Sequence, residues 1–151
     1  MGELWSAYGG QVWRAMLAAS AGRRDLADDV TQEAFARLIV YRETVHDPLA
    51  WLFRTAYRLL AAELRDERRR GGEAVDQTAV IAEEFSGELV SALAALDPKL
   101  RLCVFLRYYA DLPVGEVARL TGMSVTATKV RLHRARRRLR ATLEEKEVAR
   151  V

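Results

Sequence analysis

The chain has 151 residues, of which 50% are hydrophobic and 30% charged, with a formal net charge of +3. This composition fits one folded domain or two small ones, and it excludes a disordered chain. No apolar run approaches the roughly 18 residues of a membrane span, the N-terminus lacks a basic segment followed by an apolar one, and the single cysteine, Cys103, excludes a disulfide framework, so we expect a cytoplasmic protein.

The pattern of apolar residues predicts an all-α fold. Pro48, Pro98 and Pro113 each stand where a helix could begin, and strand-like alternation is absent. The expected helices cover residues 3–20, 24–41, 48–69, 86–95, 98–109, 114–121 and 125–145. After three arginines the composition changes abruptly, through two glycines, into an acidic stretch. We expect a flexible linker over residues 71–87, between small helical domains of residues 1–70 and 88–151.

The predicted helix over residues 24–41 carries a polar face, made of Asp28, Asp29, Gln32 and Glu33. Its apolar side consists of Val30, Ala34, Leu38 and Tyr41. Clustered carboxylates can bind a metal ion, but no further ligands occur at suitable spacing. Acidic residues also favour a helix N-terminus without any binding role. A polar docking surface is the functional interpretation that the sequence favours.

The next predicted helix combines aromatic and basic side chains. Trp51, Phe53 and Tyr57 lie along it, and it ends in the basic residues Arg65, Arg68, Arg69 and Arg70. Aromatic rings beside basic residues can stack on the bases of single-stranded nucleic acid. The same rings can instead belong to the core, because positions 51, 52, 55 and 59 form a packing stripe. By itself the pattern favours the core.

The segment LPVGEVARLTGMSVTATKVRL has the layout of a helix-turn-helix. Val117, Ala118 and Leu120 supply the apolar side of the first helix. Gly122 can adopt the positive φ of a tight turn, and Ser124 can cap the second helix. A second helix placed in this way belongs in the major groove of DNA.

That second helix continues into KVRLHRARRRLR, which is strongly basic. No Asp or Glu occurs between Glu116 and Glu144, although a solvated helix face usually interleaves acids with bases. An apolar stripe fixes the charges in space: Thr128, Leu132, Ala135, Leu139 and Leu143. The opposite face consists of Thr126, Ala127, Val130, Arg134 and Arg137. These features indicate that the helix binds DNA.

Taken in order, the motifs resemble the extracytoplasmic-function (ECF) sigma factors, small two-domain initiation subunits of bacterial RNA polymerase. LADDVTQEAFARL resembles the polymerase-docking helix of region two, and DPLAWLFRTA resembles the promoter-melting helix. The stretch from LDPKLRL to RRRLR resembles region four. The resemblance covers nearly the whole chain and implies a region-two helical bundle and a region-four helix-turn-helix.

The resemblance also implies three sets of contacts. The docking surface for the polymerase clamp helices is Asp28, Asp29, Gln32 and Glu33. The contacts to the minus-ten element are Thr44, Val45, His46, Asp47, Trp51, Arg54, Arg58 and Arg65. The contacts to the minus-thirty-five element are Ser124, Thr126, Ala127, Lys129, Val130, Arg131, Arg134 and Arg137. The implied partners are bacterial core RNA polymerase, through its clamp helices and flap, promoter DNA and an anti-sigma protein.

Two alternative functions follow from the same residues. One is a stand-alone helix-turn-helix regulator that binds duplex DNA as a dimer. The other is a sigma-like protein that binds polymerase but melts promoters weakly, because Arg58 and Ala62 stand where the family commonly has Asn and Asp. We expect no enzymatic activity, cofactor or metal, since no nucleophile–base pair, phosphate-binding loop or metal-ligand spacing occurs.

Overall fold

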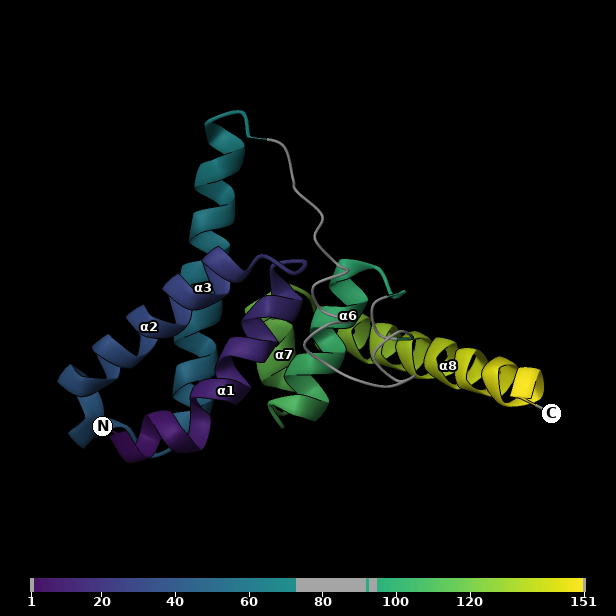
Figure 1. Cartoon of the computed structure of the whole chain (residues 1–151), viewed down its shortest axis with the longest axis horizontal. Coiled ribbons are helices and arrows are strands. Elements are labelled where there is room, and N and C mark those ends of the chain that lie inside the picture. The colour runs from purple at the N-terminus through teal and green to yellow at the C-terminus, as the bar shows by residue number, and fades with distance from the viewer. Residues whose placement is uncertain (1, 73–91, 93–94, 151) are drawn as a thin grey trace.

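The structure, a computed structural model, describes residues 2–72, 92 and 95–150 (Figure 1). Within these residues it is helical and contains no strand, which confirms the all-α class. The N-terminal half consists of α1 (Gly2–Ala19), α2 (Arg24–Tyr41), a short 3-10 turn η1 (Arg42–Thr44) and α3 (Pro48–Arg69). The C-terminal half consists of α6 (Pro98–Val104), the π-helical turn η2 (Phe105–Tyr109), α7 (Val114–Thr121) and α8 (Val125–Arg150). The predicted helix over residues 86–95 and the predicted linker fall almost entirely outside the described residues.

The N-terminal half is a three-helix bundle around an apolar core. Each helix contributes one fully buried stripe: Val12, Ala15 and Met16 from α1, Val30, Ala34 and Leu38 from α2, and Leu52, Phe53, Ala56 and Leu60 from α3. The predicted stripe on α3 was therefore wrong by one position, and Trp51 is only half-buried. Tyr41, predicted on the apolar side of α2, is 55% exposed instead. Asp47 caps α3 by accepting a hydrogen bond from the Ala50 amide at 3.2 Å.

A partly buried ion pair joins the start of α2 to the end of α3. The Arg23 guanidinium donates to the Glu67 carboxylate, near the end of α3, and to Asp25 at 3.0 Å. Hydrogen bonds from Arg23 lower the pKa of Glu67 and of Asp25. A lowered carboxyl pKa contributes stability above the unfolded value of about 4, and this contribution is lost as the pH falls through the folded value.

Glu67→Gln is therefore expected to destabilise the chain at pH 7 but much less at pH 3. At the lower pH the wild-type carboxylate is increasingly protonated, so its advantage over glutamine shrinks. Urea unfolding of both chains at the two pH values measures this difference. Glu63→Gln, an exposed carboxylate on the same helix, is the control and should show no such convergence. A gap between Glu67→Gln and wild type that stays constant with pH would contradict the assignment.

The helix-turn-helix of the C-terminal half is confirmed. Gly122 follows α7 with a φ of 72°, and the Ser124 hydroxyl accepts a hydrogen bond from the Ala127 amide at 3.0 Å. Thr128 is fully buried where α8 packs, but its hydroxyl donates to the Ser124 carbonyl at 2.8 Å, which satisfies the polar group. Leu132 and Ala135 continue the buried stripe of α8.

Gly122→Val is expected to destabilise the chain by about 2 kcal/mol, because a β-branched residue is strained at positive φ. The space around the glycine is open, so strain of the backbone rather than a clash causes the loss. Gly115→Val is a matched control, since that glycine also faces open space but has no positive φ. Denaturant unfolding compares the two, and equal losses would show that the turn tolerates any residue.

The predicted helix over residues 98–109 begins as the α-helix α6 and continues as the π-helical turn η2. The Ala110 amide bonds to the Phe105 carbonyl at 2.9 Å, five residues back, and the Leu112 amide bonds to the Leu106 carbonyl at 3.0 Å. This wider turn ends at Asp111, whose φ is 54°. The predicted helix over residues 125–145 also extends further, to Arg150. No described helix is long and apolar enough to span a membrane.

The two halves pack against each other. α1 lies against α6 and η2, and α3 touches α7, while the C-terminal ends of α3 and α8 extend outward from the body (Figure 1). The apolar core runs on without a break from one half into the other. Cys103, Leu106 and Val117 of the C-terminal half belong to the same buried cluster as the bundle residues.

Candidate nucleic-acid interface

The polar face of α2 is exposed along one side of the bundle. Asp29, Gln32 and Glu33 are exposed, and Glu33 makes a solvent-exposed ion pair with Arg37, one turn further on, at 3.0 Å. Asp28 differs from them, because its carboxylate accepts a hydrogen bond from the Trp13 indole of α1 at 2.6 Å. Asp28 thus fastens α2 to α1, while the other three side chains remain available to a partner.

A pocket of about 470 Å³ opens where η1 leads into α3. Six of the predicted minus-ten residues line it together with Tyr41: Thr44, Val45, His46, Asp47, Trp51 and Arg54. Arg58 and Arg65, which lie further along α3, are exposed but do not line the pocket. Tyr41 was not among the predicted contacts, and its ring centroid lies 6.4 Å from that of Trp51 in a tilted arrangement. Two aromatic rings, polar loop groups and a guanidinium can stack on and hydrogen-bond an unstacked base.

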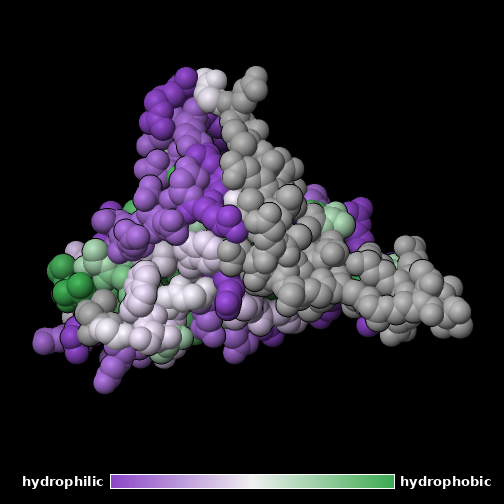
Figure 2. Space-filling model, viewed as in Figure 1, coloured by the Kyte–Doolittle hydropathy of each residue, from purple (hydrophilic) through white to green (hydrophobic). Residues whose placement is uncertain are grey.

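Apolar surface borders this pocket. Ile39 and Val40, the residues before Tyr41 at the end of α2, are 55% and 75% exposed. Figure 2 shows hydrophobic surface at that end of the molecule, whereas the projecting end of α3 is hydrophilic. Adjacent exposed apolar residues of this kind mark a binding surface more often than isolated ones do.

Helix α8 has an exposed face, called here the reading face, opposite its buried stripe. Thr126, Val130, His133 and Arg137 are exposed, and at about 100° per residue they lie opposite Thr128, Leu132 and Ala135. His133 was not among the predicted contacts, although the helical period places it on this face. Val130 is 45% exposed on this face. A methyl-bearing side chain flanked by donors suits the major groove.

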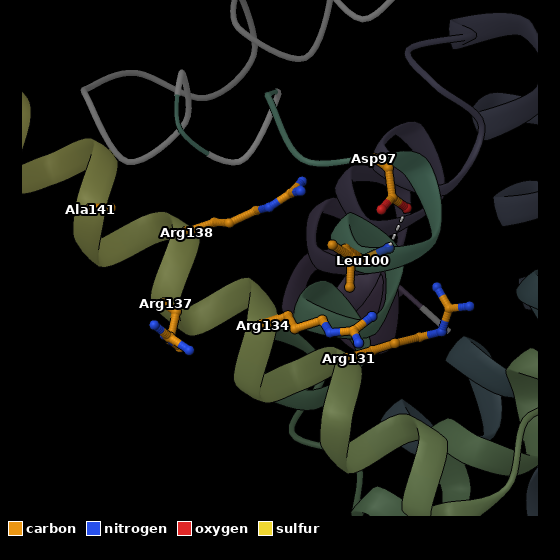
Figure 3. A pocket seen from close by; sticks show the side chains of 7 residues that line it. All are labelled: Asp97, Leu100, Arg131, Arg134, Arg137, Arg138 and Ala141. Atoms are coloured by element: carbon orange, nitrogen blue, oxygen red, sulfur yellow. Dashed lines mark hydrogen bonds between the residues drawn. The ribbon is translucent and has the colours of Figure 1, made fainter.

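A second basic surface runs along the flank of α8 that faces α6. It borders a groove of about 440 Å³, lined by Asp97, Leu100, Arg131, Arg134, Arg137, Arg138 and Ala141. Figure 3 shows Arg131, Arg134 and Arg138 reaching toward α6, whereas Arg137 points away from it. The structure therefore separates Arg134 from Arg137, which the sequence pattern had placed on one face. Asp97, whose carboxylate caps α6 by accepting from the Lys99 and Leu100 amides at 3.0 Å, is one negative charge against the four arginines that line the groove.

The opposite flank of α8 is hydrogen-bonded to η2. Arg136 donates to the Tyr108 hydroxyl of η2 at 2.8 Å, so this arginine helps to orient the helix. Of the predicted minus-thirty-five residues, Ser124 forms the cap, and Thr126, Lys129 and Val130 are exposed near the start of α8. Together, the described residues present an aromatic pocket on one half and an arginine-rich helix on the other.

Comparison with known proteins gives two family matches in chain order. Residues 4–70 match Sigma-70 region 2, and residues 86–139 match Sigma-70, region 4. The ECF RNA polymerase sigma factor SigL of Mycobacterium tuberculosis is 29% identical over 99% of this chain and 92% of its own length. The ECF RNA polymerase sigma factor BldN of Streptomyces coelicolor is also 29% identical, over 95% of the chain, which spans 60% of BldN.

A solved structure supports the same fold. The sigma factor RpoE from Bartonella quintana, in complex with the anti-sigma factor NepR, superposes with a TM-score of 0.71 over 95% of both chains at 21% identity. At that identity the likeness concerns the fold alone. Since the two sigma-70 regions cover most of the chain in order, and full-length relatives are ECF sigma factors, the chain belongs to the ECF family of RNA polymerase sigma factors.

Proposed function

We propose that the chain binds bacterial core RNA polymerase and directs it to a particular set of promoters. In this proposal residues 1–70 dock on the clamp helices and hold the minus-ten strand, and residues 88–151 contact the flap and read the minus-thirty-five element. Residues 71–87 join the two domains. The chain would act in the cytoplasm, on the nucleoid when bound to polymerase, as a DNA-binding subunit that adds no catalytic group of its own.

One observation carries the proposal: each half presents a nucleic-acid surface suited to a different form of DNA. The pocket beside Trp51 offers rings and hydrogen-bond groups to an unstacked base. The α8 face offers a narrow helix, basic on both flanks, to an intact major groove. A protein that reads duplex DNA at one site and a separated strand at another fits promoter opening.

Transcription in vitro from genomic DNA, with purified core polymerase in the presence and absence of the chain, tests this function. We expect new transcripts whose start sites share upstream sequence elements. If the chain adds no transcripts although it binds duplex DNA as a dimer, the stand-alone regulator is correct. The exposed docking face of α2 argues against that alternative, because a regulator of this kind needs no such surface.

The alternative of a sigma-like protein that melts promoters weakly requires a separate test with a second DNA template. Arg58 is exposed and Ala62 half-buried on α3, where the family commonly has Asn and Asp. Once a promoter is known, a duplex template is compared with one that is mismatched, and therefore already open, at the minus-ten element. Equal transcription from both indicates competent melting, whereas strong dependence on the open template supports the sigma-like protein with weak melting.

We also propose an inhibitor protein as a partner. The structural relative RpoE was solved in complex with the anti-sigma factor NepR, and this chain shares its fold over 95% of both chains. Purification of the tagged chain from the source organism, followed by identification of the proteins that co-purify with it, tests for such an inhibitor.

A further inference from the structure

The groove between α8 and α6 gathers cations on one flank of α8. Arg131, Arg134 and Arg138 follow one another at spacings of three and four residues, so their side chains leave the same side of the helix. All three reach toward α6 (Figure 3). In the part of the chain that the structure describes, neither Arg131 nor Arg134 makes an ion pair, whereas Arg107 and Arg119 of the same half each pair with an acid. The groove therefore holds positive charge that an external anion can neutralise.

The size of the groove fits a small molecule. Its volume of about 440 Å³ lies within the range of roughly 300–1,000 Å³ that is usual for small-molecule sites. Leu100 of α6 and Ala141 of α8 add apolar atoms to the lining. A DNA duplex cannot enter this space, because its major groove alone is about 12 Å wide. The groove is thus a separate site from the reading face, although both belong to α8.

The lining selects for linked phosphate groups. A guanidinium donates two parallel hydrogen bonds to one phosphate, which makes arginine well suited to bind phosphate. From Arg131 to Arg138 the helix rises by about 10 Å, so a single phosphate cannot reach all three guanidinium groups equally well. A short chain of phosphates can follow the row. Carboxylates of an acidic peptide carry one charge on each side chain, whereas linked phosphates concentrate several charges in a small volume.

We propose that this groove binds an oligophosphate of two or three linked phosphate groups, and that this ligand competes with promoter DNA. The phosphate chain can belong to a nucleoside polyphosphate or be inorganic, since both present the same chemistry to the arginines. The competition rests on the proposed function, because it concerns the duplex that α8 reads.

Arg134 connects the groove to the reading face. It is exposed and lies about 40° around the helix from Val130, at about 100° per residue. Its long side chain can turn into the groove or toward a phosphate at the edge of the major groove. An oligophosphate in the groove holds it away from the duplex. By linkage, the ligand weakens duplex binding by the same factor by which the duplex weakens ligand binding.

Calorimetric titration of the full chain with tripolyphosphate tests the site, in about 0.15 M salt to screen exposed charges. Tripolyphosphate should bind at least about tenfold more tightly than orthophosphate, because it engages more than one guanidinium. Ala141→Glu adds a carboxylate to the groove and keeps a good helix former, so it should weaken binding about tenfold. Ala7→Glu, at an exposed alanine of α1, makes the same change in net charge and should bind as wild type does.

A second variant should strengthen binding, which an unfolded chain could not do. Asp97→Asn removes the acidic residue from the lining, and asparagine caps a helix as well as aspartate does. Tripolyphosphate affinity should rise about threefold or more. Glu63→Gln removes an exposed acid of α3 and should leave the affinity unchanged. If each variant matches its control, or if tripolyphosphate binds no better than orthophosphate, the groove is not an oligophosphate site.

Further ligands identify the source of the phosphates. ATP and ADP are compared with tripolyphosphate and pyrophosphate. Tighter binding of the nucleotides supports a nucleoside polyphosphate, whose base contacts the apolar lining, whereas equal binding supports recognition of the phosphate chain alone. A glutamate peptide that binds as tightly as tripolyphosphate would overturn the assignment to oligophosphates.

Competition is measured with a labelled duplex bound by the full chain in complex with core polymerase. Tripolyphosphate should release the duplex at concentrations at which sulfate of equal ionic strength does not, and Asp97→Asn should require less of it. Simultaneous binding of both ligands without loss of affinity would show that the competition is wrong. If the chain binds no duplex, the proposed function fails, while calorimetry still decides whether the groove binds oligophosphates.

Discussion

Reversing the charge of Asp29 and Glu33 together, by substitution with lysine, is expected to abolish binding to core RNA polymerase. Both carboxylates are exposed on α2, and neither is needed by the bundle core. Within the described part of the chain, the double substitution removes the exposed Glu33–Arg37 pair, which contributes a few tenths of a kcal/mol. Helical content should therefore stay unchanged while polymerase affinity falls by at least a hundredfold, measured by anisotropy of labelled chain.

The matched control carries the same change in net charge elsewhere. Glu3→Lys with Glu63→Lys alters two exposed acids on α1 and α3, away from the polar face. Comparing the two double variants shows whether the polymerase recognises the α2 surface specifically or only responds to the net charge of the chain. If both double variants lose the same affinity, or neither does, then α2 is not the docking helix.

Substituting Val130 with aspartate is expected to abolish sequence-specific binding to promoter duplex. Val130 is 45% exposed on the reading face, so the helix loses little packing. A carboxylate there removes an apolar contact with the thymine methyl group and adds repulsion from the phosphates. Val130→Thr keeps one methyl group and should retain most of the affinity. The full chain, in complex with core polymerase, is titrated with a promoter identified by transcription and with a scrambled duplex.

Arg134→Ala belongs to a different class of variant. Its side chain lies in the groove toward α6, so we expect a phosphate contact rather than a base contact. Its loss should weaken binding to promoter and scrambled duplex alike and lower the salt slope by about one unit. Should Val130→Asp also weaken both duplexes equally, α8 would serve as an electrostatic anchor and the sequence would be read elsewhere.

Local signals in the sequence predicted most of the fold. The ranges 24–41 and 48–69 match α2 and α3, because Pro48 at the first position and Asp47 as cap define where α3 can start. Gly122 and Ser124 likewise defined the turn before α8. Such features depend on a few neighbouring residues, which a sequence displays directly.

Features that depend on how distant residues meet were not predictable in this way. The wide turn over Phe105–Tyr109 has no local signal of its own, and the exposure of Tyr41 depends on where the loop after α2 folds back. The pairing of Arg54 with Glu116 requires knowing that α3 touches α7. Position 134 was placed with 137 by helical period alone, and only the location of α6 separates them.

The projecting end of α3 has a consequence for proteolysis. Arg68, Arg69 and Arg70 are exposed in the last turn of this helix, beyond the Arg23–Glu67 ion pair that joins α3 to the start of α2 (Figure 1). Helix ends of this kind fray, and trypsin cleaves after arginine in frayed segments first. The cut would fall between the halves without touching the apolar contact that joins them. Two fragments would then elute together in gel filtration, and the protein would remain one particle after its chain had become two.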